Sequence, residues 1–360
     1  MSLALSRRVA GPLVLLLSLG CGTKAPPPPD VTLGASTDSI QTTLYEATSG
    51  AWLGGDRWAV VSPADQRVVI LDFAAKSTSE LGAGVKNPYR SPFALFTSGD
   101  SLYVSDWALS RVTVWTLGGH FAGAVPAPGN TRGTLPSARD GAGNWYVQLN
   151  PPPGSDGSGR RDSARVLRLT PDFSRADTVL SLSPPDLALV EGDAGRRYER
   201  RVFSGEDGWG VLPDGSLWVA RVLANRVDWI GADGKMQKGQ PLPDRVFTIT
   251  PADREDFLRH FPPALRSAAD KVPVSPVKPP FEHAFTAGDQ TVWLEKSRVI
   301  PDTVRRYQVI GRDGRLAENV AFNGYGRVLA ASPTAVLVKD AQPTGMRFVR
   351  MKRPAAAPAP

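Results

Sequence analysis

The chain has 360 residues, of which 41% are hydrophobic and 21% charged, and its formal net charge is +7. This composition is typical of a folded globular protein with enough apolar material for a core. The positive charge is spread along the chain without a Lys/Arg stripe, so we expect no binding of nucleic acid. A single cysteine excludes an intramolecular disulfide and a cysteine-based metal site.

Residues 1–20 have the pattern of a signal peptide. Arg7 and Arg8 precede a short apolar run at residues 13–17, and small residues stand before Cys21. The segment ending at Cys21 resembles the bacterial lipoprotein signal, which implies cleavage before the cysteine and attachment of lipid to it. We therefore expect a protein exported to the cell envelope whose contact with the membrane is this lipid anchor. The alternative is a soluble secreted or periplasmic protein.

The next segment, 21–30, holds the lipid-attachment site and a proline run at residues 26–29, which predicts an extended linker. Residues 31–350 are expected to form one folded domain. Residues 351–360 end in alanine and proline alone, which predicts a disordered tail.

The expected domain contains six repeats of a turn followed by alternating apolar residues. The turns begin at Gly55, Gly99, Gly143, Gly215, Gly288 and Ser332. Three of the five intervals are 44 residues long and the other two are 72 and 73, so two repeats carry insertions. A period of about 40–50 residues is typical of propeller blades.

Each repeat continues into a second strand that opens with arginine, and Asp-Gly pairs at 214–215, 233–234 and 313–314 predict tight hairpins. This order of residues, clearest at Asp106 and Arg111, resembles the NHL-like and TolB-like six-bladed β-propeller families. The resemblance implies an all-β propeller with four-stranded antiparallel blades. In it, Asp106 and Arg111 are expected to pair and fix the hairpin.

The last repeat is one strand short, and residues 31–36 precede the first repeat without a partner. We therefore expect an N-terminal strand at 31–36 to complete the last blade and close the ring, which removes exposed sheet edges.

Four long segments interrupt the repeats, at 150–164, 184–203, 250–281 and 296–304. In a four-stranded blade they all fall between the second and third strands or between blades, so they share one face. Loops on a rigid scaffold often carry function, so this face is the expected binding face. Segment 250–281, between blades 4 and 5, predicts a short helix capped by Thr250, which acts as a lid or as a packing brace.

Six residues stand nine positions before the repeat turns, where each innermost strand is expected to begin: Glu46, Arg90, Thr134, Glu206, Pro279 and Asn323. Oxygen ligands from Glu46, Glu206 and Asn323 suit Ca²⁺. Gluconolactonase-like propellers hold a divalent metal in the channel through such side chains, which makes a Ca²⁺ site here a hypothesis.

The first functional hypothesis is a non-catalytic envelope protein that binds a small molecule or a protein partner near Arg90, Arg201, His283 and Tyr325. The alternative is a divalent-metal-dependent hydrolase of the lactonase or esterase kind, with His283 as general base. A third hypothesis is a docking disc for other envelope proteins, which needs an exposed apolar patch. The sequence leaves these three open.

Overall fold

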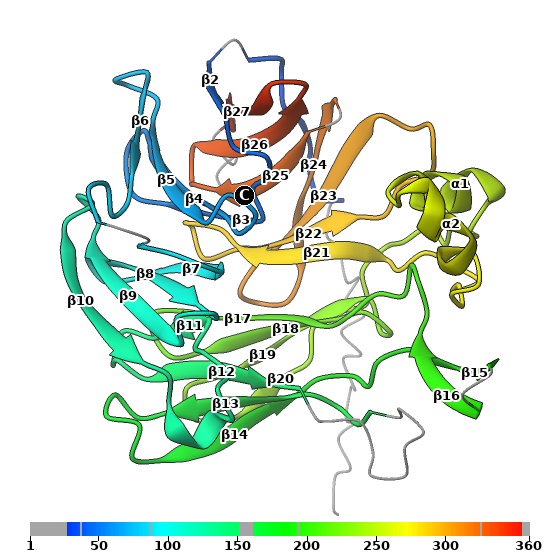
Figure 1. Cartoon of the computed structure of the whole chain (residues 1–360), viewed down its shortest axis with the longest axis horizontal. Helices are drawn as coiled ribbons and strands as arrows, with labels where there is room; N and C mark the ends of the chain where they lie inside the picture. Colours follow the sequence, from blue (N-terminus) through cyan, green and yellow to red (C-terminus); the bar gives the residue numbers. More distant parts are fainter. Residues whose placement is uncertain are drawn as a thin grey trace, which may run out of the picture.

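The computed structural model describes residues 27–36, 38–85, 88–150, 161–192, 195–324 and 326–354. These residues form a six-bladed β-propeller, and each blade is a four-stranded antiparallel sheet (Figure 1). The first strands of successive blades contact one another around the centre. The fold predicted from the sequence is therefore confirmed. The proposed signal peptide, Cys21 and Tyr325 lie outside the described residues.

Within each blade the strands run from the centre outward in chain order. Blade 1 contains β3 (Ser49–Trp52), β4 (Arg57–Ser62), β5 (Arg67–Asp72) and β6 (Ser77–Glu80). Blade 2 contains β7 (Pro92–Ser98), β8 (Ser101–Asp106), β9 (Arg111–Thr116) and β10 (Phe121–Pro126). Blade 3 contains β11 (Ala138–Arg139), β12 (Trp145–Leu149), β13 (Arg165–Leu169) and β14 (Ala176–Ser181), and the short helix η1 (Gly129–Thr131) precedes it.

The second half of the ring repeats this order. Blade 4 contains β17 (Gly208–Val211), β18 (Leu217–Arg221), β19 (Arg226–Ile230) and β20 (Met236–Gln237). Blade 5 contains β21 (Phe281–Thr286), β22 (Val292–Lys296), β23 (Val304–Ile310) and β24 (Leu316–Asn323). Blade 6 contains β25 (Arg327–Ala331), β26 (Ala335–Gln342) and β27 (Gly345–Lys352), completed by β2 (Ser39–Thr42).

An N-terminal strand closes the ring, but it is not the expected one. β2 pairs antiparallel with β27, with Ile40 opposite Phe348, so residues 39–42 complete blade 6. The segment predicted to do this instead forms β1 (Asp30–Thr32), which adds to the outer edge of blade 5 in parallel with β24. The prediction that residues 31–36 close the ring is therefore wrong, because the next strand along the chain, β2, closes it.

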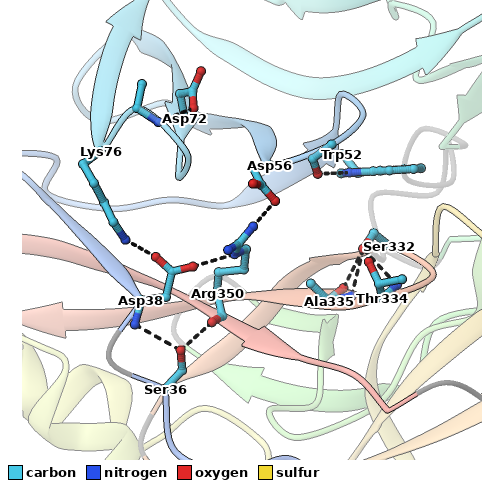
Figure 2. A network of polar contacts seen from close by, with 12 residues as sticks. Ser36, Asp38, Trp52, Asp56, Asp72, Lys76, Ser332, Thr334, Ala335 and Arg350 are labelled. Carbon is cyan, nitrogen blue, oxygen red and sulfur yellow. Dashed lines mark hydrogen bonds and ion pairs between the residues drawn. The ribbon is translucent and has the colours of Figure 1, made fainter.

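Polar contacts fasten this closure (Figure 2). The Arg350 guanidinium on β27 binds Asp38 just before β2, at 2.6 Å, and also binds Asp56 of blade 1. Lys76 of blade 1 binds the same Asp38 carboxylate, and Ser36 donates to the Arg350 carbonyl at 2.7 Å. These contacts link both ends of the domain to blade 1.

The core lies between neighbouring blades. Trp58 and Leu71 of blade 1, for example, pack against Leu337 and Phe348 of blade 6 in one buried cluster. Because strand residues alternate between the two faces of a sheet, each blade offers an apolar face to each neighbour. Trp58, Trp218 and Trp293 are fully buried in such layers, so these tryptophans serve the core.

The side chains of Asp106 and Arg111 bind backbone groups rather than each other, unlike the expected pairing. The two residues are opposite each other in the β8–β9 ladder, but the Asp106 carboxylate accepts hydrogen bonds from the backbone amides of Arg90, Ser91 and Leu109. Arg111 instead donates to the Pro88 carbonyl at 2.9 Å. Both residues fix the loop that enters blade 2, each through backbone groups.

Two insertions project at the right of Figure 1 beside blades 4 and 5: the hairpin of β15 (Leu187–Gly192) and β16 (Gly195–Arg200), and the helices α1 (Pro251–Arg259) and α2 (Pro263–Ala269). Thr250 and Asp253 form the predicted capping box of α1. The two insertions brace each other, since the Val202 amide donates to the Pro273 carbonyl at 2.8 Å. Within the described residues, neither helix is long and apolar enough to cross a membrane.

The ordered chain continues past the expected boundary at residue 350. β27 runs to Lys352, and Arg353 is buried between Asp289 at 2.6 Å and Glu318 at 3.0 Å. Arg353 therefore ties the C-terminal end of the propeller to blade 5.

Candidate functional site

A pocket of about 670 Å³ opens where the long segments meet the innermost strands of blades 4 and 5. We call it the rim pocket. Its wall includes the loop at 203–207, Asp253 and Asp256 of α1, the start of β21 and Arg298 after β22. Arg305 and Arg327 from blades 5 and 6 also line it. The face that the sequence predicted as the binding face thus holds this pocket.

A buried carboxylate holds the inner wall together. The Glu295 side chain is 1% exposed and accepts hydrogen bonds from Arg305 at 3.0 Å and from Arg327 at 2.5 Å. Charge-assisted contacts of this kind are strong when water is excluded. They fix the two guanidinium groups against the wall and join blade 5 to blade 6.

Two further carboxylates are fixed in the same way. The side chain of Asp207 is buried, and its carboxylate binds Arg221 at 2.8 Å and the Val222 amide at 2.9 Å. Asp253 binds Lys278 at 2.5 Å. Burial raises the pKa of Asp253, but the hydrogen bond from Lys278 and the capping contacts outweigh it, so this pKa lies below its usual value.

Glu282 and His283 reach the pocket from an irregular point of β21. Phe281 is opposite Lys296 and His283 is opposite Glu295, so the ladder shifts register and Glu282 is the extra residue of a β-bulge. Bulges re-aim side chains beside functional sites. Neither side chain makes a hydrogen bond or an ion pair with any other residue in the described part of the chain.

The pocket walls shift the pKa values of both groups in the direction of the neutral form. Enclosure by protein raises the pKa of Glu282, and the nearby Glu295 carboxylate raises it further. Enclosure is also the main cause that lowers the pKa of His283 to about 4, with smaller contributions from Arg327 and Lys339. His283 is therefore a neutral imidazole at neutral pH.

Arg298 is the remaining charged residue of the pocket. Its guanidinium donates to the Asp302 carbonyl at 2.7 Å, and it forms no ion pair with a carboxylate of the described residues. The pKa of Asp302 is lowered mainly by the hydrogen bonds from the Val304 amide and from Arg306, and to a smaller extent by the charge of Arg298. Arg298 follows the end of β22, which pairs with the start of β21 where Glu282 lies. Both groups therefore stand at the same rim of blade 5.

The structure describes three of the four predicted ligand-binding residues and places them at different points. His283 lines the rim pocket. Arg90 is exposed, and its backbone amide is fixed by Asp106 at 2.7 Å. Arg201 contacts Asp186 at 3.4 Å and the Val274 carbonyl at 3.2 Å, so it joins the two insertions. Tyr325 lies outside the described residues.

The three predicted calcium ligands have different surroundings. Glu206 lines the rim pocket and pairs with Arg200. Glu46 accepts from the Ala64 amide at 2.8 Å in blade 1, and Asn323 ends the outer strand β24. Among the described residues no group of three His, Cys, Asp or Glu side chains could hold a metal ion. A Ca²⁺ site at Glu46, Glu206 and Asn323 stays a hypothesis, and we derive no metal-dependent step.

Sequence reasoning missed Glu282, Glu295 and Arg298. A charged residue inside the apolar strand 292–296 was a signal for Glu295, because such a residue must find a partner when buried. The bulge that exposes Glu282 has no local sequence signature. Arg298 gains its place from a long loop, whose path depends on distant contacts.

No family model matches the chain, and no curated protein matches it. Among solved structures, the calcium-binding protein regucalcin from Agrobacterium tumefaciens is 8% identical over 91% of this chain and 98% of its own, with a TM-score of 0.44. A member of the DUF4221 family from Bacteroides vulgatus is 8% identical over 88% and 97%, with a TM-score of 0.49. Virginiamycin B lyase from Staphylococcus aureus is 9% identical over 86% and 94%, with a TM-score of 0.41. The chain is similar to these proteins in the arrangement of its strands alone.

Proposed function

We propose that this protein binds a small zwitterionic ligand, of the size of a short peptide, in the rim pocket. One observation carries the proposal. Glu282 and Arg298 stand at the same rim without an ion-pair partner among the described residues, whereas the other charged side chains of the pocket are paired. A ligand ammonium beside Glu282 and a ligand carboxylate beside Arg298 would give each of these two side chains an ion-pair partner.

The size and the place of the pocket support this proposal. Pockets for small molecules typically enclose about 300–1,000 Å³, and the rim pocket falls within that range at about 670 Å³. The buried ion pairs of Glu295, Asp207 and Asp253 fix part of its wall, so little side-chain freedom is lost there when a ligand enters.

Triglycine and two blocked forms of it test the proposal by calorimetry. Acetylation removes the ammonium and amidation removes the carboxylate, so each blocked form should bind about tenfold or more weakly than triglycine. Glu282→Gln should abolish the difference between triglycine and its acetylated form, and Arg298→Met the difference between triglycine and its amide. Equal binding of all three compounds to the unaltered protein would rule out zwitterion recognition.

We also propose that the protein is exported and held at the membrane by a lipid on Cys21. The support is the sequence before Cys21, which resembles a lipoprotein signal. Cys21→Ser should move the full chain from the membrane fraction to the soluble fraction. A full chain that stays in the soluble fraction with Cys21 intact would contradict the anchor.

A hydrolase of the lactonase or esterase kind is the second candidate function. The place of His283 in the rim pocket carries this candidate, because a general base must reach the bound substrate. Its pKa of about 4 leaves the imidazole unprotonated at neutral pH but makes it a weak base. Hydrolysis of p-nitrophenyl acetate that His283→Gln abolishes would support this activity. Hydrolysis that persists in this variant would show that His283 is not the general base.

Elemental analysis of the purified protein shows whether a metal is bound. A bound metal together with loss of activity in chelator would indicate the metal-dependent form of this hydrolase.

A further inference from the structure

A second cavity, of about 520 Å³, lies beside the β15–β16 hairpin. We call it the hairpin cavity. One side of its wall is apolar and consists of Leu182, Pro184, Pro185, Leu187, Tyr198 and Val222, and polar residues such as Arg161 and Asp162 also line the cavity. In the rim pocket, about half of the lining residues are charged. The two cavities therefore suit different parts of a ligand.

The two cavities share one wall. Gln148, Arg200, Gly205, Glu206 and Asp207 line both of them. Asp207 is held by Arg221, and Gln148 accepts a hydrogen bond from Trp209 at 2.6 Å, so these parts of the wall are fixed.

The rest of the shared wall is an exposed ion pair between Arg200 and Glu206. Their side chains are 48% and 60% exposed. Exposed pairs of this kind contribute little to stability, so side-chain rotation opens the wall at low cost. The rim pocket and the hairpin cavity then form one elongated cleft.

We propose that the hairpin cavity is a second subsite of the same binding site and takes an apolar side chain of the ligand whose charged groups lie in the rim pocket. This inference rests on the proposed function and narrows the ligand class to zwitterions with an apolar arm, such as short peptides with leucine-like or aromatic side chains. Arg200 and Glu206 lie along the passage between the two subsites.

Calorimetry with triglycine and leucyl-glycyl-leucine tests the inference. A leucine side chain that leaves water for an apolar wall should raise affinity about tenfold or more over triglycine. Leu187→Asp places a charge in the hairpin cavity. It should abolish that gain and leave the binding of triglycine unchanged.

Leu189→Asp is the matched control, because Leu189 is on the same strand but does not line either cavity. It should leave both affinities unchanged. Equal affinities of the two peptides for the unaltered protein, or a leucine gain that survives Leu187→Asp, would overturn the second subsite alone. If neither peptide binds, the proposed function fails and this inference fails with it.

Discussion

Glu282 and His283 are adjacent residues whose pKa values shift in opposite directions for the same reason. The walls of the rim pocket disfavour a charge on either group, so the Glu282 pKa rises and the His283 pKa falls. Their contributions to stability therefore depend on pH with opposite signs.

Glu282→Gln should change the pH dependence of stability. Because the folded-state pKa of Glu282 lies above its usual value near 4.5, its contribution is fully present below about pH 4.5 and is lost as pH rises through the raised pKa. The melting temperature of the variant relative to the unaltered protein should therefore rise as the pH increases above about 4.5. A difference that stays constant over this range would show that the Glu282 pKa is normal in the folded protein.

His283→Gln should act in the opposite direction and over a different pH window. The folded-state pKa of His283 is about 4 and its usual value is 6.5, so the folded protein resists protonation that the unfolded chain accepts. The unaltered protein should lose stability as pH falls from about 6.5 to about 4, and the variant should lose less. Nuclear magnetic resonance titration of the His283 ring provides the direct check. A midpoint near 6.5 would contradict the shift.

At the scale of elements, the ring depends on a small clasp between its two ends. Arg350→Met removes the contacts to Asp38 and Asp56 and should lower the free energy of unfolding by about 1–3 kcal/mol, measured by urea denaturation. Arg347→Met on the same strand is the control, because Arg347 pairs with Asp340 at a more exposed site. Similar losses in both variants would show that the clasp has no special role.

The helical insertion depends on a buried ion pair. Lys278→Met leaves the Asp253 carboxylate, which is 1% exposed, without its cation. Breaking a buried pair typically costs about 3–5 kcal/mol, so the amides of α1 should lose protection from hydrogen exchange while the blades keep theirs. Lys271→Met, at an exposed position, should leave exchange unchanged. Unchanged protection of α1 in Lys278→Met would show that the helix is held by other contacts.

At the scale of the whole molecule, the ordered domain should need residues beyond 350. Met351 is buried in a cluster that includes Trp293, and Arg353 bridges two carboxylates of blade 5, Asp289 in the β21–β22 turn and Glu318 on β24. A chain ending at residue 350 should therefore melt at a lower temperature than a chain ending at 354. Equal melting temperatures would show that β27 contributes little after residue 350.

The sequence was sufficient for the propeller because the turns, hairpins and alternation of each blade are local patterns. It misplaced the closing strand because pairing of β2 with β27 joins residues at opposite ends of the chain. The segments around Val31 and Ile40 are both short and mix polar with apolar residues. Only long-range packing decides which of the two segments completes blade 6. His283 could be predicted because histidine is rare in this chain and this one lies on an innermost strand. Glu282 and Arg298 could not be predicted, because their places depend on the bulge in β21 and on the loop after β22.

The central claim is that Glu282 and Arg298 bind opposite charges of one ligand. The most direct measurement is a crystal structure of the protein grown with triglycine. We expect density in the rim pocket with the ligand ammonium at the Glu282 carboxylate and the ligand carboxylate at the Arg298 guanidinium. Triglycine bound elsewhere, or in the rim pocket without these two contacts, would contradict the account.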